Sequence, residues 1–291
     1  MKSNLLLSHI QQVKLINFIL SNEYSLFVLL MILTAFPVGF FAGLFGIGGG
    51  LITVPFLFFI FETLNIDKSY IMHLAVGTSF SIIIPTSIVS VLTHKKHKSV
   101  DISIIKSYGL FVILGVFLGT IFAALMQTRS LVLFFSLIVY ILGTYLLLFQ
   151  DKTGEAKKKF NFFHKLIFGS VAGFISASMG IGGAIMNVPL LRYFGYPIKK
   201  AIGSAAAIGF IIATFGAIGF LISGSFLDAN LPLSIGFINI PAFLIFIPIT
   251  TFMARVGANT VHKINKTKVQ ALFGIFLYVV GTIFIYRYLS L

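Results

Sequence analysis

Two copies of one phrase interrupt this chain: Gly46-Ile47-Gly48-Gly49-Gly50-Leu51-Ile52-Thr53-Val54-Pro55 and, 134 positions later, Gly180-Ile181-Gly182-Gly183-Ala184-Ile185-Met186-Asn187-Val188-Pro189. Each copy lies within a strongly apolar stretch. Glycine and proline break helices, and a helix broken within lipid leaves polar backbone groups that only protein or a water-filled cavity can satisfy. Matched breaks in the two halves of a chain indicate the binding site of a transporter built from repeats.

The composition excludes an ordinary soluble globular protein. The 291 residues are 58% hydrophobic and 10% charged, with a mean hydropathy of +1.06, whereas a typical soluble domain is ~25% charged. With 34 Phe and no Trp, phenylalanine fills much of the apolar volume. The absence of cysteine excludes disulfides, thiolate metal sites and cysteine nucleophiles.

The net charge of +14 indicates membrane orientation and no nucleic-acid partner, because the basic residues lie in short clusters between apolar runs. Most of these residues fall in the connections 94–106, 150–165, 192–200 and 255–268. The connections 62–70, 127–130 and 223–232 contain one basic residue or none. We therefore expect a multi-pass protein of the cell membrane, with the basic connections in the cytoplasm.

Six apolar runs are long enough to cross a bilayer as helices. They are Ile71–Leu92, Ile102–Met126, Leu131–Phe149, Ala201–Ile222, Leu233–Ala254 and Val269–Tyr286. Two further regions, Leu26–Phe61 and Leu166–Phe194, contain the glycine phrases. Each could be a pair of short helices that crosses twice, a re-entrant hairpin, or one long kinked helix. Basic connections on both sides of the second region require an even number of crossings, which disfavours the kinked helix.

The two halves match beyond the glycine phrases. Ala75-Val76-Gly77-Thr78-Ser79 corresponds to Ala201-Ile202-Gly203-Ser204-Ala205, while corresponding loops differ in charge. We therefore predict an all-α polytopic membrane protein of two inverted-topology repeats, with about 8–10 membrane segments. Each repeat comprises a Gly-broken helix pair or re-entrant hairpin and three transmembrane helices, and both termini lie outside. The predicted units are an interfacial segment at 1–23, repeats at 24–149 and 166–291, and a cytoplasmic linker at 150–165.

These residues resemble the signature of the sulfite exporter TauE/SafE family, also called the toluenesulfonate uptake permease family. The resemblance covers roughly residues 25–288 and rests on two sets of positions. The first half contributes Gly39, Gly43, Gly46, Gly48, Gly49, Gly50, Pro55, Gly77, Thr78 and Ser79; the second contributes Gly173, Gly180, Gly182, Gly183, Pro189, Gly203 and Ser204. The chain departs from the family pattern at Ala184 and Ala205. The resemblance implies transport of a small sulfur-containing anion such as sulfite, a sulfonate or a related organosulfur compound.

A sulfite or sulfonate group is compact, anionic and rich in acceptor oxygens, so its transfer requires donors that replace water. Backbone N–H groups at helix starts supply such donors, and glycine allows the anion to approach them closely. The predicted substrate-binding residues are Gly46, Gly48, Gly49, Gly50, Thr53, Thr78, Ser79, Gly180, Gly182, Gly183, Asn187 and Ser204. Close helix packing is the alternative explanation for the glycines, and the hydroxyl groups could instead bond their own helices.

The leading hypothesis is a transporter that works by alternating access. A passive anion channel using the same amides is an alternative, and an intramembrane enzyme is a weaker one, since the runs lack mid-span carboxylates and a Ser–His constellation. We expect no catalytic residues, no metal and no cofactor. The lipid bilayer and a small anion are the expected partners, and the sequence leaves the oligomeric state, the direction of transport and the energy source open.

Overall fold

The computed structural model describes residues 23–45, 49–64, 66–148, 160–227, 229, 231–260 and 266–290. The interfacial segment predicted at 1–23 lies outside the described residues except for Glu23. The same holds for the predicted linker 150–165 except for residues 160–165, and for Gly46 and Gly48 of the first glycine phrase.

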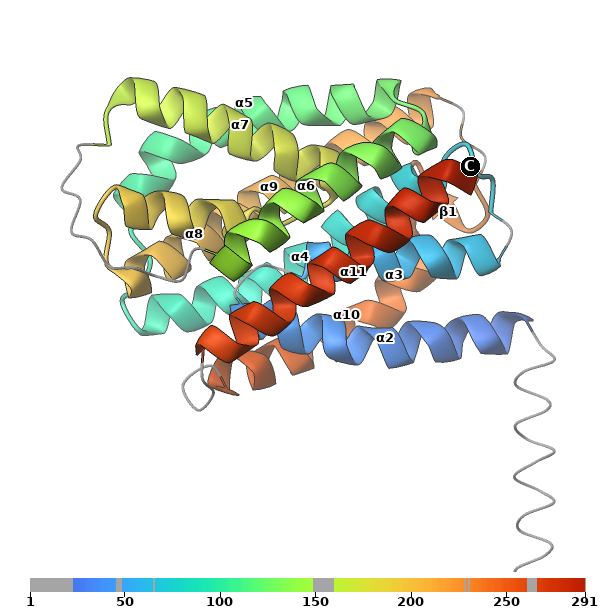
Figure 1. The fold of residues 1–291 in the computed structure, drawn as a ribbon, viewed down its shortest axis with the longest axis horizontal. Coiled ribbons are helices and arrows are strands. Elements are labelled where there is room, and N and C mark those ends of the chain that lie inside the picture. The colour runs from blue at the N-terminus through green and yellow to red at the C-terminus, as the bar shows by residue number, and fades with distance from the viewer. Residues whose placement is uncertain are drawn as a thin grey trace, which may run out of the picture.

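The described chain is almost entirely helical (Figure 1). Its helices are α2 (Glu23–Phe45), α3 (Gly50–Thr63), α4 (Ile71–Lys96), α5 (Ile102–Leu125), α6 (Thr128–Leu148), α7 (Phe162–Met179), α8 (Ala184–Tyr193), α9 (Ile198–Phe226), α10 (Ile240–Thr260) and α11 (Lys266–Ser290). Among the described residues, eight of these helices are long and apolar enough to cross a membrane, and α3 and α8 are shorter. The predicted all-α polytopic membrane fold is confirmed.

One predicted span begins too early. Helix α10 starts at Ile240, whereas the apolar run predicts a start at Leu233. The intervening residues form a two-stranded antiparallel hairpin, β1 (Ser234–Ile235) and β2 (Ile238–Asn239). Gly236 turns this hairpin with a positive φ of 55°, a conformation that glycine adopts without steric cost.

Both glycine-interrupted regions form helical hairpins. Helix α3 returns toward the end of the molecule at which α2 begins, and α8 returns toward the end at which α7 begins (Figure 1). This arrangement agrees with the even number of crossings that the charge pattern requires, and it excludes a single long kinked helix. The two hairpins enter from opposite ends of the bundle.

Basic residues collect at one end of the bundle. At the left in Figure 1 lie the α4–α5 connection, the start of α7 and the α8–α9 connection. At the right lie the α3–α4 and α5–α6 connections and the β1–β2 hairpin. The segments at the left end contain Lys95, Lys96, Lys98, Lys165, Lys199 and Lys200, whereas the described basic residues in the right-end segments are Lys68, Arg129 and, near the end of α11, Arg287. The connections that the sequence groups by charge therefore lie at the same ends of the molecule.

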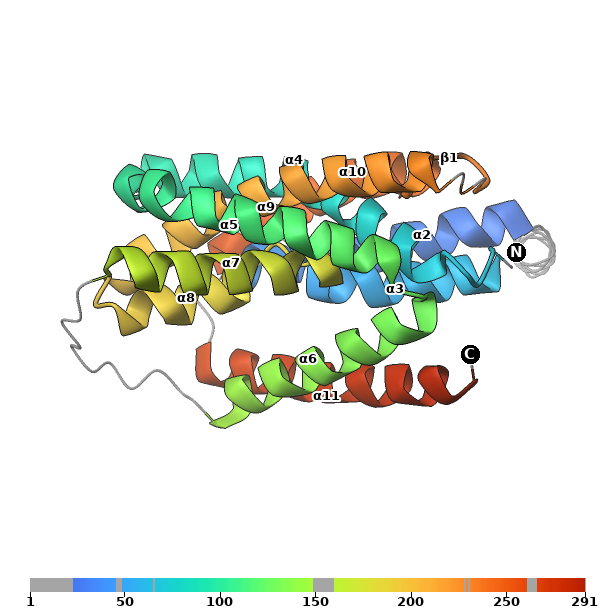
Figure 2. The same ribbon diagram turned by 90° about the horizontal axis from the view of Figure 1, so that it is seen from above.

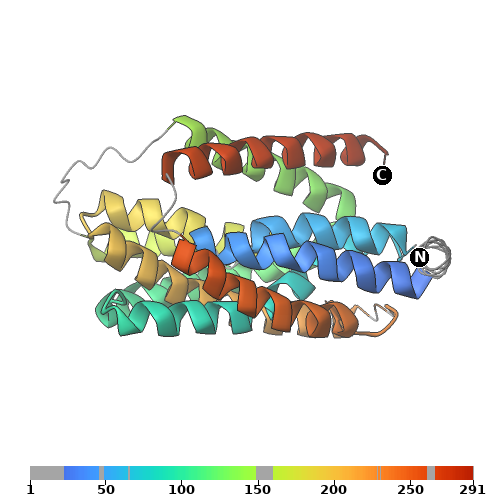
Figure 3. The ribbon, with the colours of Figure 1, turned by 90° about the horizontal axis from the view of Figure 1, so that it is seen from below.

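Helices α4 and α9 form the centre of the bundle. They pack against each other. They are also the most buried of the spans, because 67% of the apolar stretch of α4 and 56% of that of α9 are buried inside the molecule. Helix α2 packs on α10, and α5 packs on α7. Helices α6 and α11 pair with each other and form a layer on one side of the rest (Figures 2 and 3).

Contacts between the two halves are reciprocal, most clearly between α6 and α11. The Tyr140 hydroxyl bonds the Thr282 hydroxyl at 2.8 Å, and the Tyr278 hydroxyl bonds the Thr144 hydroxyl at 2.6 Å. Position 140 corresponds to 278 and position 144 to 282 under the same shift of 138 residues. Each half thus presents the same pair of groups to the other, as in a contact related by a two-fold axis.

Candidate functional site at the two helix breaks

The first break depends on a left-handed glycine. Helix α2 ends at Phe45, and Gly49 has a φ of 86° immediately before α3 begins at Gly50. An L-residue with a Cβ is costly in this conformation, whereas glycine adopts it readily. The backbone can therefore turn sharply between the two helices without strain.

The second break uses two such residues. Gly180 ends α7 with a φ of 72°, and Gly183 precedes α8 with a φ of 69°. The amide of Ile181 donates to the carbonyl of Ser176 at 3.0 Å, which closes the last turn of α7. Gly182 is buried between them, and its carbonyl lies against Gly209 of the central helix α9.

The two breaks touch each other. The missing Cβ of Gly50 faces the carbonyl oxygen of Gly180, and it would lie 2.9 Å from the Cα of Ile181. The missing Cβ of Gly180 would in turn lie 2.7 Å from the Val54 side chain of α3. Residues 130 positions apart in the chain (50 to 180) are thus in backbone contact, and in this conformation Gly50 has the packing role that small residues have in membrane bundles.

Each short helix begins in the same way. The carbonyl of Gly49 accepts from the amide of Thr53 at 2.9 Å and from the Thr53 hydroxyl at 3.0 Å. The carbonyl of Gly183 accepts from the amide of Asn187 at 3.0 Å and from its side-chain amide at 2.8 Å. Thr53 and Asn187, which correspond in the sequence, therefore fix the two helix starts.

The amides at these helix starts are the potential ligands of an anion. These are the N–H groups of Gly50 and Leu51 in α3 and of Ala184 and Ile185 in α8. At the first turn of a helix, an N–H group has no carbonyl of its own helix to bond. The partial positive charge of a helix N-terminus favours a negative ligand there. The glycines at 49, 50, 180, 182 and 183 are all buried, so an anion at this position would be shielded from bulk water.

Tyr108 is a polar neighbour that the sequence analysis does not identify. Its hydroxyl donates to the side-chain oxygen of Asn187 at 2.7 Å, and both side chains are fully buried. Asn187 thus has both a donor and an acceptor partner, as a buried amide requires. Tyr108 lies 79 positions from Asn187, and no spacing in the sequence links the two.

Ser79 joins the central helix α4 to the second break. Its hydroxyl donates to the carbonyl of Gly180 at 3.0 Å and is fully buried. Thr78, one position earlier, accepts at 2.9 Å from the amide of Asn239, the last residue of β2, which immediately precedes α10. Both hydroxyl groups bond other segments of the chain rather than their own preceding turn, and only Ser79 contacts a glycine phrase.

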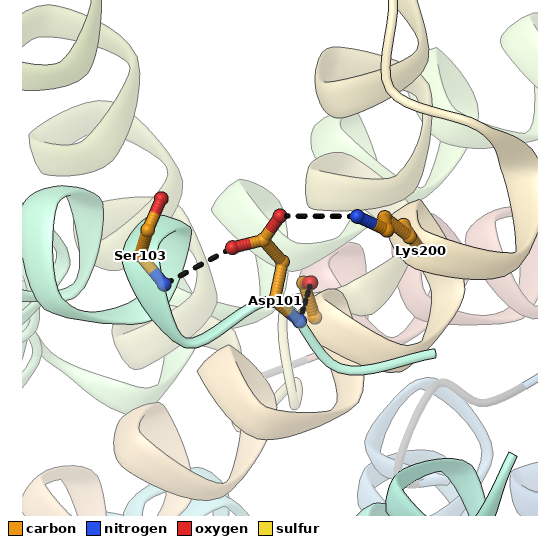
Figure 4. Close-up of polar contacts among 4 residues, drawn as sticks. Asp101, Ser103 and Lys200 are labelled. Carbon is orange, nitrogen blue, oxygen red and sulfur yellow. Dashed lines mark hydrogen bonds and ion pairs between the residues drawn. The ribbon is translucent and has the colours of Figure 1, made fainter. Parts of the chain in front are cut away.

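Ser204 lies at the basic end of the bundle, away from the breaks. Its hydroxyl accepts from the amide of Asp101, whose side chain accepts from the amide of Ser103 and lies 3.7 Å from Lys200 (Figure 4). Burial, and to a lesser extent the charge of Asp101, raises the pKa of the nearby Tyr196. Ser204 thus supports the start of α5, as Thr78 supports the start of α10.

Ser176 is the second residue that the sequence analysis misses. Its hydroxyl is fully buried and has no hydrogen-bond partner among the described residues. It lies 3.1 Å from the position that a Cβ on Gly183 would occupy, beside the start of α8. The corresponding residue of the first half is Ala42, whose Cβ is 3.0 Å from the equivalent point on Gly49. A buried hydroxyl without a partner is costly unless a ligand uses it.

The described residues contain no group of three or more His, Cys, Asp or Glu side chains that could hold a metal ion. His73 is buried in α4, and its ring nitrogen Nε2 bonds the carbonyl of Ala123 at 2.9 Å. The side chain of His73 is therefore enclosed by the protein. It belongs to an aromatic cluster with Tyr70 and Phe237, because the β1–β2 hairpin covers this end of α4.

Comparison with known proteins confirms the resemblance over most of the chain. The sequence model of the family described as "Sulfite exporter TauE/SafE" matches residues 31–284. A "Probable membrane transporter protein" of Haemophilus influenzae is 32% identical over 255 residues, which cover 88% of this chain and 97% of the relative. A probable membrane transporter protein of Methanocaldococcus jannaschii is 30% identical over 265 residues, which cover 89% and 96%.

No solved structure matches the chain. The family match spans far more than half of the sequence, and the names of the relatives indicate a transporter rather than an enzyme. The chain is therefore a multi-pass membrane transporter that belongs to the sulfite exporter TauE/SafE family.

Proposed function

We propose that this transporter moves a small sulfur-containing anion, held by backbone amides where the two glycine breaks meet. The contact between Gly50 and Gly180 carries the proposal, because it places the start of α3 against the second break, whose short helix α8 begins four residues after Gly180. The family description names sulfite, which has the compact shape and acceptor oxygens that such amides suit. Sulfonates and related organosulfur anions have the same chemistry.

The hydrogen-bonding pattern supports a ligand at this place. The amides at the two helix starts have no acceptors within their helices, and the Ser176 hydroxyl beside α8 has no partner among the described residues. These donors all suit an anion. The side chains of Thr53, Ser79 and Asn187 already donate hydrogen bonds to glycine carbonyls. Their proposed role is therefore to hold the backbone donors in position.

Alternating access and the inverted repeat form the second part of the proposal. The reciprocal Tyr–Thr contacts of α6 and α11 support two related halves, and the two glycine hairpins run in opposite directions. In an inverted repeat, rocking of one half against the other opens a central site first to one side and then to the other. The contact of Gly50 with Gly180 would be closed in one step of this cycle and would loosen when the anion enters.

We propose that the basic end of the bundle faces the cytoplasm of a cell with this protein in its plasma membrane. Lys95, Lys96 and Lys98 belong to the α4–α5 connection at that end, and by the positive-inside rule such clusters favour the cytoplasmic side. Helix α11 ends at the opposite end of the bundle, where α2 also begins, so both termini would lie outside.

Uptake into proteoliposomes tests the function directly, with labelled sulfite, thiosulfate, sulfoacetate and taurine as probes. Wild-type protein is expected to accumulate at least one of them, while Gly49→Val and Gly182→Val abolish uptake and still insert into the membrane. Gly195→Val is the matched control, since Gly195 has a φ of 83° but lies in an exposed loop away from the breaks. Normal uptake by both break variants would reject the amide site. Ionic current far above the rate of alternating access would identify a channel instead.

A further inference from the structure

An apolar groove runs along the outside of the bundle between α5 and α9. It encloses about 830 Å³ and is lined by exposed side chains that include Leu110, Leu114, Phe117, Phe215 and Ile222. The few polar groups in its wall are already bonded: for example, the Thr120 hydroxyl donates to the carbonyl of Phe117 at 2.9 Å. The groove therefore accepts an apolar chain and offers no polar recognition.

A second, polar pocket continues this groove beside the α3–α4 and α5–α6 connections. It encloses about 480 Å³ and is lined by Lys68, Ser69, Gln127 and Arg129, among others. The two hollows share three lining residues: Ala124, Leu125 and Leu227. They form one surface whose long part is apolar and whose end is polar and cationic.

Among the described residues, no ion pair neutralises the two cations of this pocket. Among the described residues of this end, Arg287 pairs with Glu62 at 3.0 Å, whereas no Asp or Glu lines the pocket that contains Lys68 and Arg129. Arg129 is held in place by Tyr288. The Nε of Arg129 donates to the carbonyl of Tyr288 at 3.2 Å, and the guanidinium carbon lies 4.7 Å from the centre of the Tyr288 ring. Four further N–H donors of the guanidinium remain for another acceptor.

We propose that this surface binds an anionic phospholipid, with an acyl chain in the α5–α9 groove and the phosphate at Lys68 and Arg129. An apolar groove that ends in two cations at the end of a membrane bundle matches the shape and charge of such a lipid. A free anion would use the pocket and leave the groove empty. A second copy of the chain would have to cover two cations that pair with no described carboxylate. The proposal is independent of the transported substrate.

Native mass spectrometry of the purified, delipidated full-length protein tests the site, with dipalmitoyl phosphatidylglycerol and dipalmitoyl phosphatidylcholine as probes. Phosphatidylglycerol is expected to form one adduct at lower concentration than phosphatidylcholine. Lys68→Gln with Arg129→Gln should weaken that adduct about 30-fold, since each basic residue near anionic lipid contributes ~1 kcal/mol. The matched control, Lys95→Gln with Lys96→Gln, removes the same charge at the other end and should leave the adduct unchanged.

Each alternative gives a different result. Equal binding of the two lipids, or equal loss in the control variant, would overturn the proposal in favour of non-specific attraction. If glycerol phosphate displaced the bound phosphatidylglycerol as readily as phosphatidylglycerol itself does, the groove would contribute nothing to the binding. A dimer whose formation excludes the lipid adduct would assign the groove to a second copy of the chain.

Discussion

Glycine serves two different purposes at the breaks, and each glycine can be assigned to one of them. Gly49, Gly180 and Gly183 have positive φ angles of 86°, 72° and 69°, so they are needed for the turn itself. Gly50 lies in helix α3, and its missing side chain is needed because the Gly180 backbone fills that space. The three glycines with positive φ set the path of the chain, and Gly50 sets the distance between the halves.

Substitution of Gly50 tests this distinction. Gly50→Ala is expected to destabilise the protein by about 1–3 kcal/mol, because overpacking against a rigid backbone forces it to move. Gly109→Ala is the matched control, since its Cβ would meet only the flexible end of Ile211 at 3.2 Å. Thermal unfolding in detergent measures both. Equal stability of the two variants would contradict the close contact between the breaks.

Ser176 leads to a prediction in which stability and binding respond differently. Ser176→Ala removes a buried hydroxyl that has no partner in the described part of the chain, so the free energy of unfolding should stay the same or rise. Anion affinity should fall roughly tenfold, because a hydrogen bond to a charged group is lost. Ser178→Ala is the matched control, since Ser178 already donates to the carbonyl of Phe174 at 2.9 Å. Unchanged anion affinity in Ser176→Ala, measured by equilibrium binding, would remove this hydroxyl from the site.

At the scale of the elements, the helices follow from the sequence and their partners do not. All six uninterrupted spans and both breaks are predictable, because long apolar runs and clustered glycines have direct structural consequences. The hairpin at 234–239 is missed, because Ile235, Phe237 and Ile238 continue directly into the apolar helix that follows. Pro232 and Gly236 are the signals that could have revealed it.

The composition of the candidate site is only partly predictable for a similar reason. Gly49, Gly50, Thr53, Ser79, Gly180, Gly182, Gly183 and Asn187 lie at or against the breaks, whereas Thr78 and Ser204 support helix starts elsewhere. Tyr108 and Ser176 are missed because each looks like an ordinary residue of an apolar helix. Only the tertiary contact of α5 with α8, or of α7 with the start of α8, gives them significance.

The α6–α11 pair tests whether the two halves are equivalent. Thr144→Val and Thr282→Val each remove one of the two reciprocal Tyr–Thr bonds. Each is expected to lower the free energy of unfolding by a similar amount, about 1 kcal/mol. Because the Tyr140 and Tyr278 rings contact each other, the two losses are expected to couple in the double variant. Unfolding of the single and double variants measures this. A large loss in one variant and none in the other would contradict the equivalence.

The arrangement of the whole molecule predicts which connections share a side of the membrane. The chain has no cysteine, so single introduced cysteines can be labelled without a background signal. Lys98→Cys and Lys199→Cys should react with an impermeant maleimide from the cytoplasmic side, and Ser69→Cys and Ser290→Cys from the outside. Lys98 and Lys199 labelled from opposite sides would contradict the bundle and the inverted repeat together.

The central claim is that backbone amides of both breaks bind the transported anion. Hydrogen–deuterium exchange of the purified protein, with and without a saturating transported anion, measures those amides directly. Bound anion is predicted to slow exchange in peptides that cover 49–53 and 182–187, and to leave peptides from α6 unchanged. Exchange that stays the same at both breaks, or slows at only one of them, would contradict the claim.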